Sequence, residues 1–273
     1  MRLSSIHVYP VKSLRGADAS SVQVRPYGLA GDRRWIVVDA DRKFVTIREC
    51  PAMLGVRAET SAEGLIFHVR GRRAFAVALP PAAAPTVMVR IWNDTVPAKL
   101  LEGDGGALLS EALGRPVALA HLADPTARPV EAAYGRAGDH VSFADAFPLL
   151  LASRASLMDL ERRLGHSLAM ERFRPNVVIE GGEPWAEDRW RRIRIGGVDF
   201  RVAKPCARCA IPTRDPETGA ELADGEPLRA LAAFHRGAGG KIMFGQNLIP
   251  DGGGALSVGD PVEIIEAGDS NVA

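Results

Sequence analysis

Residues 192–202 read Arg-Ile-Arg-Ile-Gly-Gly-Val-Asp-Phe-Arg-Val, with apolar and charged side chains alternating on both sides of a Gly-Gly pair. Alternation with a period of two predicts a half-buried β-strand, and Gly-Gly is favoured in tight hairpin turns. The stretch therefore predicts a β-hairpin. Outward from it, residues 176–179, 241–249 and 261–266 are further strand candidates, so we expect a C-terminal half rich in β structure.

The first hundred residues show the same pattern of short strand-like runs, at residues 3–9, 22–24, 34–38, 65–69, 74–78, 87–92 and 95–100. Asn93-Asp94 is expected to be the turn between the last two. Strands at this spacing suggest a barrel or a sandwich. Helices are expected at residues 107–113, from Ser153 to a closing Gly165, and at residues 226–235. The predicted fold class is mainly β with a few helices (α+β).

Length and composition limit the function classes. At roughly 150 residues per domain, 273 residues predict about two domains, with a boundary between residues 101 and 122. The net charge of +1 argues against a generally basic nucleic-acid binder. No apolar run approaches the roughly 18 residues of a membrane span, and the N-terminus has no secretory apolar region. Three cysteines are too few for a disulfide framework, so we expect a cytoplasmic protein without nucleic-acid or membrane partners.

The 34 basic residues comprise 29 Arg and only 5 Lys. Compositional bias explains most of this excess, and the alternative is that some arginines serve as planar forks for phosphate or carboxylate. Several common motifs are absent. Gly237-Ala-Gly-Gly-Lys241 fails as a phosphate loop because His235 and Ile242 occupy two of its required positions. Dinucleotide-binding, zinc-protease and serine-hydrolase signatures do not occur either.

Cys206-Ala-Arg-Cys209 is the only spacing in the chain that suggests metal or redox chemistry. Cys50 alone cannot complete a zinc site, and the surrounding prolines oppose the helix of a thioredoxin-like motif. We therefore expect both cysteines on a loop that leaves a strand at residues 200–203. Two interpretations of the pair are possible. Both thiols are inert, or one thiolate binds a soft metal ion; in the second case Arg208 would lower the pKa of that thiol.

Seven segments together resemble one family, and they appear in that family's order over nearly the whole chain: Tyr9-Pro-Val-Lys-Ser13, Gly31-Asp-Arg-Arg-Trp35, Thr46-Ile-Arg48, Phe173-Arg-Pro-Asn176, Cys206-Ala-Arg-Cys209 with Asp215-Pro-Glu-Thr-Gly219, Phe244-Gly-Gln246 and Val258-Gly-Asp-Pro-Val262. The family is that of the MOSC proteins, named for the C-terminal domain of molybdenum cofactor sulfurase. The chain is most similar to its two-part members, among them the mitochondrial amidoxime-reducing components and their bacterial relatives.

The resemblance implies an N-terminal MOSC-associated β-barrel domain at residues 1–115 and a MOSC β-barrel domain at residues 116–273. It also implies a molybdenum cofactor (Mo-molybdopterin) in the cleft between them, with Cys209 as the metal ligand. The implied cofactor-binding residues are Lys12, Ser13, Arg33, Asp145, Arg174, Asn176, Ala207, Arg208 and Cys209. Arg174 is expected to be held extended by Pro175 and to reach the cofactor. Asp215 is assigned a catalytic role near the metal, the alternative being a turn residue.

Three positions depart from the family pattern. Ala207 stands where relatives often carry Ser, so only its backbone N–H could contribute, and Phe147 and Asn247 replace smaller or hydroxyl-bearing residues.

The implied activity is reduction of small N-hydroxylated compounds (amidoximes, hydroxylamines or N-hydroxylated bases). Electrons would come from a separate donor protein of ferredoxin, flavoprotein or cytochrome type. One alternative is a cofactor or sulfur carrier without reductase activity, and another is a metal-free anion-binding module.

Overall fold

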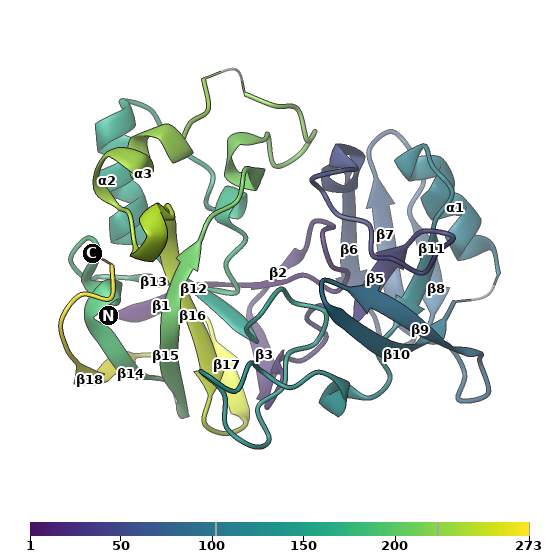
Figure 1. The fold of residues 1–273 in the computed structure, drawn as a ribbon, viewed down its shortest axis with the longest axis horizontal. Coiled ribbons are helices and arrows are strands. Elements are labelled where there is room, and N and C mark those ends of the chain that lie inside the picture. The colour runs from purple at the N-terminus through teal and green to yellow at the C-terminus, as the bar shows by residue number, and fades with distance from the viewer. Residues whose placement is uncertain (102, 223, 273) are drawn as a thin grey trace.

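The computed structural model describes residues 1–101, 103–222 and 224–272, and within them it has 18 strands and three α-helices. Figure 1 shows two β-rich halves side by side: a mostly green-to-yellow C-terminal half, which also contains the purple strand at the N-terminus, and a mostly blue-to-teal N-terminal half. The mainly β fold class is therefore confirmed. No helix in these ranges is both long and apolar enough to cross a membrane.

The C-terminal half is built on an eight-stranded sheet in the order β18-β14-β15-β16-β12-β13-β1-β2. Its strands are β1 (Arg2–Val8), β2 (Ala17–Ala19), β12 (Leu149–Ser153), β13 (Val177–Glu180), β14 (Trp190–Ile195), β15 (Val198–Ala207), β16 (Met243–Pro250) and β18 (Val262–Ala267). The expected hairpin is β14–β15, in which Ile195 pairs with Val198. β1 pairs antiparallel with β13, so the N-terminal strand belongs to this sheet.

β12 and β13 run parallel, and α2 (Arg154–Leu164) makes the crossover between them. The Ser153 side chain caps the start of α2 by accepting from the Ser156 N–H, and Gly165 ends the helix in the left-handed region, with φ of 78°. Both were expected from the sequence. β12 itself was missed, because a short apolar run without alternation does not distinguish strand from helix.

The N-terminal half contains the sheet β5-β11-β10-β9 and the sheet β6-β7-β8. The strands are β5 (Trp35–Val38), β6 (Val56–Thr60), β7 (Gly64–Val69), β8 (Phe75–Ala78), β9 (Thr86–Ile91), β10 (Asp94–Leu100) and β11 (Ala118–His121). A third small sheet joins β3 (Ser21–Arg25) to β4 (Gly28–Leu29) and β17 (Gly254–Ser257). Asp94 pairs with Ile91, so the β9–β10 turn is Trp92-Asn93, one residue earlier than expected.

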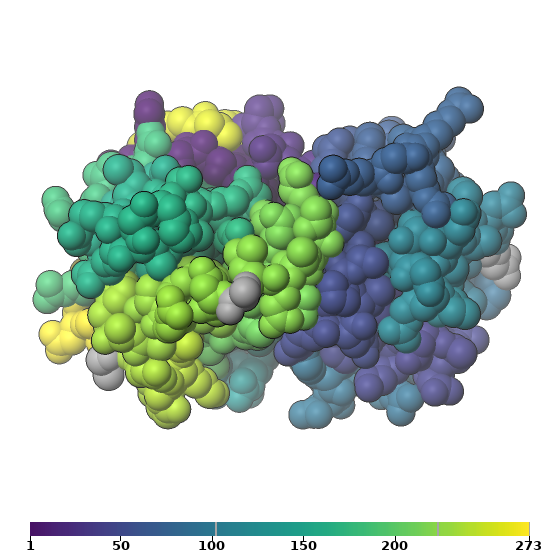
Figure 2. Space-filling view, turned by 90° about the horizontal axis from the view of Figure 1, so that it is seen from above, coloured from purple at the N-terminus to yellow at the C-terminus, as the bar shows by residue number. Residues whose placement is uncertain are grey.

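The remaining elements are helical: α1 (Asp104–Leu113), α3 (Leu228–Phe234) and the 3-10 turns η1 (Pro51–Gly55), η2 (Pro125–Ala127), η3 (Met170–Phe173), η4 (Ala186–Arg189), η5 (Ile211–Thr213) and η6 (Ala238–Gly240). In Figure 2, the green segment after β15 reaches the blue N-terminal half. Ile211 packs there against the core around Phe67. Gly219 has φ of +74°, and a Cβ on it would lie 2.3 Å from the Pro51 carbonyl oxygen, so this contact requires glycine.

Two further local expectations were wrong. Cys206 lies within β15 rather than on a loop, because β-bulges on either side of Pro205 let the strand continue past the proline. Arg174 is not extended. It ends η3 with φ of 54° and ψ of 46°, and its N–H donates to the Glu171 carbonyl oxygen at 3.1 Å. Because Pro175 disfavours the right-handed helical region at residue 174, the turn closes in the left-handed region instead.

Candidate active site

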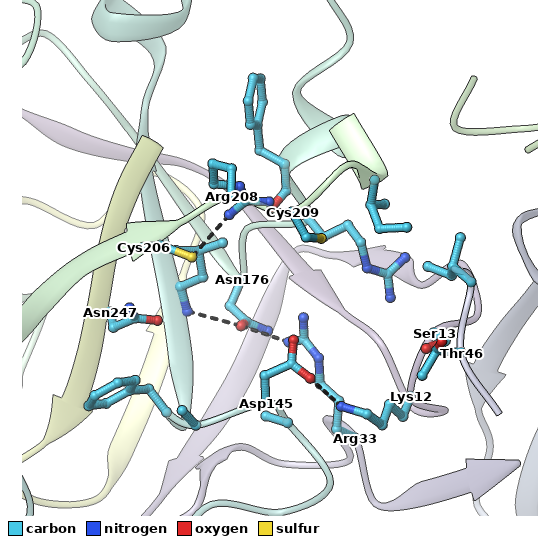
Figure 3. A pocket seen from close by; sticks show the side chains of 18 of the residues that line it. Lys12, Ser13, Arg33, Thr46, Asp145, Asn176, Cys206, Arg208, Cys209 and Asn247 are labelled. Carbon is cyan, nitrogen blue, oxygen red and sulfur yellow. Dashed lines mark hydrogen bonds and ion pairs between the residues drawn. The ribbon is translucent and has the colours of Figure 1, made fainter. Parts of the chain in front are cut away.

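A cleft between the two halves collects most of the residues singled out from the sequence. Eight of the ten line it: Lys12, Ser13, Arg33, Asp145, Arg174, Asn176, Arg208 and Cys209. Figure 3 shows Lys12, Ser13 and Arg33 on one side and the two cysteines with Arg208 on the other. Lining residues that the sequence did not single out as binding residues include Thr46, Arg48 and Cys206, and Phe147 and Asn247 line it too.

A buried lysine and an exposed carboxylate form an ion pair in the lining of the cleft. Lys12 is 5% exposed, and its Nζ donates to Asp145 Oδ1 at 2.5 Å. Burial lowers the pKa of Lys12. The cleft walls partly desolvate Asp145, which alone would raise its pKa, but Lys12, Arg33 and Arg48 together hold that pKa well below its usual range. Asp145 is therefore an ionised hydrogen-bond acceptor at every physiological pH.

Arg33 is held in a fixed orientation by two acceptors. Its Nη1 donates to Asp32 Oδ2 at 2.7 Å and to Asn176 Oδ1 at 2.8 Å. Asn176 is 1% exposed, and its Nδ2 donates to the His7 carbonyl oxygen at 3.1 Å, so its amide is already used within the protein. Asn176 thus positions Arg33 and ties β1 to the segment before β13.

Arg174 lies beside Arg33, with the ring of Tyr9 close to both. The guanidinium carbons are 4.4 Å (Arg33) and 4.5 Å (Arg174) from the Tyr9 centroid, and Arg174 Nη2 donates to the Leu14 carbonyl oxygen at 2.8 Å. Burial and the neighbouring Arg33 charge lower the pKa of Arg174 to about 10, which leaves it protonated at neutral pH. Two like charges held this close favour an anion in the cleft.

Backbone strain is concentrated around the cleft. Six non-glycine residues of the described chain have positive φ. Three of them, Ser13 (71°), Arg33 (45°) and Arg174 (54°), line the cleft, and a fourth, Trp92 (54°), donates from Nε1 to Asp145 Oδ1 at 3.3 Å. Such conformations cost of order 1–3 kcal/mol each and gather where function requires them. Their clustering makes the cleft the candidate functional site without reference to any motif.

The cysteine pair forms the opposite wall. Arg208 Nη1 donates to Cys206 Sγ at 3.1 Å and its Nη2 to the Phe173 carbonyl oxygen at 2.8 Å, while its Nε is buried with no partner in the described residues. Cys209 is exposed. The Cys209 thiol is thus accessible from the cleft, and Cys206 is partly covered and hydrogen-bonded to a guanidinium.

The structure does not place the other two predicted residues in the cleft lining. Ala207 is the last residue of β15, and its backbone pairs with Met243. Asp215 Oδ1 accepts hydrogen bonds from the backbone N–H groups of Glu217 and Thr218 at 3.0 and 2.7 Å and from the Thr218 hydroxyl at 2.8 Å. These bonds from Thr218 and Glu217 lower the pKa of Asp215. Its carboxylate organises the turn at Pro216, as the alternative reading of the sequence described.

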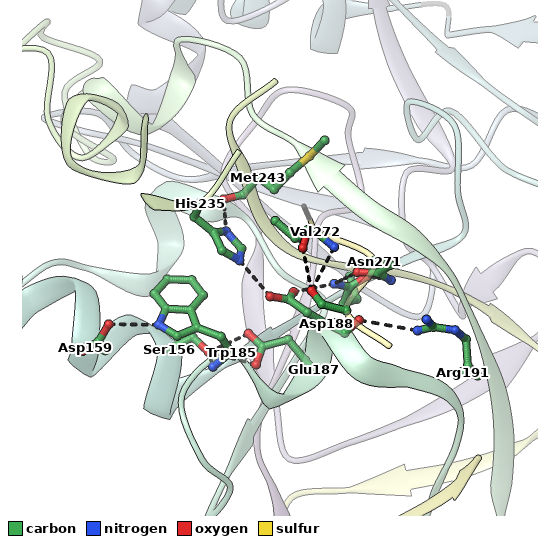
Figure 4. Close-up of polar contacts among 12 residues, drawn as sticks. Ser156, Asp159, Trp185, Glu187, Asp188, Arg191, His235, Met243, Asn271 and Val272 are labelled. Atoms are coloured by element: carbon green, nitrogen blue, oxygen red, sulfur yellow. Dashed lines mark hydrogen bonds and ion pairs between the residues drawn. The ribbon is translucent and has the colours of Figure 1, made fainter. Parts of the chain in front are cut away.

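A buried polar network braces the strand next to the cysteines (Figure 4). His235 Nε2 lies 2.8 Å from Asp188 Oδ2, and its Nδ1 lies 2.8 Å from the Met243 carbonyl oxygen. Burial favours the neutral ring, but these bonds outweigh it and raise the pKa of His235. Gln246 Nε2 also donates to Asp188, at 2.7 Å. Since Met243 and Gln246 belong to β16, the network fixes the strand that pairs with the Cys206 segment.

Comparison with known families identifies the chain. The profile of the MOSC domain matches residues 138–263, and that of the MOSC N-terminal beta barrel domain matches residues 1–116. The chain belongs to the MOSC family. Mitochondrial amidoxime-reducing component 1 from Mus musculus is 30% identical to this MOSC protein over 281 residues, covering 96% of the chain and 82% of the relative.

The human protein of the same name is also 30% identical, over 284 residues, with the same coverage of 96% and 82%. Molybdenum cofactor sulfurase from Oryza sativa subsp. japonica is 29% identical over 266 residues. That match covers 90% of the MOSC protein but only 32% of the sulfurase, so it concerns one part of a larger relative.

Proposed function

We propose that this MOSC protein is a molybdenum-cofactor-dependent oxidoreductase that reduces small N-hydroxylated compounds with electrons from a separate donor protein. The observation that carries the proposal is the accessible Cys209 thiol in a cleft that is also lined by five cationic side chains, Lys12, Arg33, Arg48, Arg174 and Arg208. The names of the amidoxime-reducing relatives support the reaction class.

The donor set of the cleft fits a metal that arrives with its own ligands. The described residues contain no group of three or more His, Cys, Asp or Glu side chains that could hold a metal ion. A soft metal that already has sulfur ligands needs only one more thiolate, and Cys209 is free to supply it. The buried, unpartnered Nε of Arg208 also indicates a polar group that the protein itself does not provide.

The cradle would be shared between the two halves. Lys12, Ser13 and Arg33 would contact the cofactor from the N-terminal half and Arg174 and Arg208 from the C-terminal half, with Cys209 as the metal ligand. The planar fork of a guanidinium donates to two oxygens of a phosphate at once, and the ionised Asp145 would accept from pterin N–H groups. Asn176 would act by orienting Arg33, and Ala207 would contribute through its backbone. We retain Asp215 only as a neighbour that shapes the segment after Cys209.

The bound cofactor would supply the two-electron redox chemistry of the reduction. Reducing an amidoxime to an amidine and water also consumes two protons. Lys12 holds a proton at Nζ between Asp145 and the rings of Phe44 and Trp92, whose centroids are both 5.7 Å away. Because its burial lowers its pKa, Lys12 releases this proton more readily than a solvated lysine does.

Carriage of the cofactor or of sulfur is the second candidate, favoured by the exposed Cys209 thiol and by the sulfurase relative. One assay separates the two. Protein loaded with cofactor is incubated with benzamidoxime and reduced methyl viologen, and benzamidine is quantified. We expect turnover by the wild type and by Cys50→Ala, whose cysteine is buried outside the cleft, and none by Cys209→Ala. Molybdenum-loaded wild type that forms no benzamidine would contradict the reductase and favour the carrier.

A further inference from the structure

One cation of the cleft, Arg48, has no hydrogen-bonding partner among the residues that the structure describes. Lys12, Arg33, Arg174 and Arg208 each donate hydrogen bonds to protein atoms. Arg48 is exposed, and within the described residues its guanidinium makes no hydrogen bond and no ion pair with a carboxylate. Its five N–H donors are therefore available to a ligand.

The indole of Trp92 nevertheless keeps Arg48 in place. The Arg48 guanidinium carbon lies 4.6 Å from the Trp92 ring centroid, within the range of a cation–π contact. Trp92 is itself fixed by its Nε1 hydrogen bond to Asp145 and by an edge contact with Phe44 at 4.8 Å. The guanidinium is thus oriented without using its donors, which lowers the entropy cost of binding an oxyanion.

The backbone conformation of Trp92 is a second observation that points to a role for this residue at the cleft. Trp92 is the first residue of the two-residue β9–β10 turn and has φ of 54°, a conformation normally occupied there by Gly, Asn or Asp. A bulky aromatic residue in this region is a steric outlier. Trp92 is also 44% exposed, so burial of its ring does not account for it. The contacts of the Trp92 ring with Arg48, Lys12 and Asp145 place it at the cleft instead.

We propose that Arg48, positioned by Trp92, forms a subsite at the cleft for a carboxylate on the substrate. The subsite rests on the proposed function, and it narrows the preferred substrates to N-hydroxylated compounds that carry a carboxylate. Arg48 is the binding residue, and its planar fork matches both oxygens of the carboxylate. Trp92 is a positioning residue.

The test compares benzamidoxime with 4-carboxybenzamidoxime. For the wild type, we expect kcat/KM to be about tenfold higher for the carboxylated compound, equivalent to about 1.4 kcal/mol, with the preference weakening as salt is added. Arg48→Gln should abolish the preference, and so should Trp92→Leu, whereas Trp92→Phe, which retains an aromatic face, should keep most of it. Arg73→Gln, an exposed arginine between β7 and β8, is the matched control and should change neither value.

Molybdenum content and direct binding of both compounds by calorimetry are measured on the same variants. If Arg48→Gln lowers kcat/KM equally for both compounds, the subsite is overturned. Loss of molybdenum from Arg48→Gln would overturn it too, because Arg48 would then be a cofactor contact. The binding experiment does not depend on turnover. If the wild type reduces neither compound, the proposed function fails, and the subsite still stands or falls on whether Arg48→Gln weakens binding of the carboxylated compound about tenfold.

Discussion

Replacing Glu187 by glutamine should stabilise the protein at alkaline pH. Glu187 is 1% exposed, and its Oε1 and Oε2 lie 2.7 and 2.9 Å from the Ser156 hydroxyl. Burial raises the pKa of Glu187 from 4.5 to about 7. Because the native state binds this proton more tightly than the unfolded state, the free energy of unfolding falls as pH rises from about 4.5 to about 7.

The magnitude follows from the size of the shift. At 1.36 kcal/mol per pKa unit, a rise from 4.5 to about 7 costs the wild type about 3 kcal/mol at pH 8, and under about 1 kcal/mol at pH 5. Glutamine is never ionised and still offers an oxygen to Ser156. For a chain of this size, about 3 kcal/mol corresponds to roughly 6–12 °C in Tm.

Thermal unfolding followed by circular dichroism at pH 5 and pH 8 tests this reasoning. Glu187→Gln should raise Tm at pH 8 and change it little at pH 5. Glu183→Gln, which alters an exposed carboxylate four residues earlier, should have no effect at either pH. A shift of the same size at both pH values, or a loss of stability at pH 8, would refute the assignment of a buried, pKa-raised carboxyl group.

Three further changes have defined outcomes. Asp188→Asn breaks the buried pair with His235 and should cost about 3 kcal/mol of unfolding free energy; because the folded pKa of His235 is raised, the deficit in Tm should be largest below about pH 6.5 and shrink as pH rises. Ser13→Gly removes the strain of a φ of 71° and should raise the free energy of unfolding by up to about 1 kcal/mol in denaturant titrations, while molybdenum content falls. A lower free energy of unfolding would contradict this. Gly219→Ala places a Cβ 2.3 Å from the Pro51 carbonyl oxygen, so Tm should drop, whereas Gly71→Ala, with open space around it, should show only the penalty of its own positive φ.

Local sequence patterns predicted a hairpin and the two ends of a helix. The alternation around Gly196-Gly197 marked the β14–β15 hairpin, and Ser153 and Gly165 marked both ends of α2. Long-range pairing left no such signal. Nothing in residues 2–8 indicates that β1 pairs with β13, more than 160 residues away.

The expected domain boundary between residues 115 and 116 stays a prediction. The strand pairing of β1 and of β11 is relevant to the position of the domain boundary. β1 belongs to the large sheet of the C-terminal half, and β11 pairs with β5 and β10 of the N-terminal half.

The family resemblance predicted most of the residues that line the cleft, but it could not show which hydrogen bonds and ion pairs their side chains make. Lys12 and Arg33 were expected as cofactor contacts, whereas their pairing with Asp145 and Asn176 emerges only from the fold. Arg48 belongs to one of the seven segments, yet only the fold shows that its guanidinium stacks on Trp92 and makes no hydrogen bond within the described residues.

The two local errors have a common origin. Proline restricts its own backbone and that of its neighbour, but it does not determine which allowed region the neighbour takes. Arg174 was expected to be extended and adopts the left-handed region. The strand expected at residues 200–203 instead continues through bulges past Pro205 to Ala207, so that Cys206 lies in the strand and not on a loop. Tertiary context decided both.

Metal analysis tests the central claim most directly. The protein is produced with molybdate in a host that makes the cofactor, and molybdenum is measured per chain for the wild type, Cys209→Ala and Cys50→Ala. We predict about one molybdenum per chain in the wild type and in Cys50→Ala, and none in Cys209→Ala with its fold intact by circular dichroism. Molybdenum retained in Cys209→Ala would contradict Cys209 as the metal ligand, and its absence from the wild type would contradict the cofactor itself.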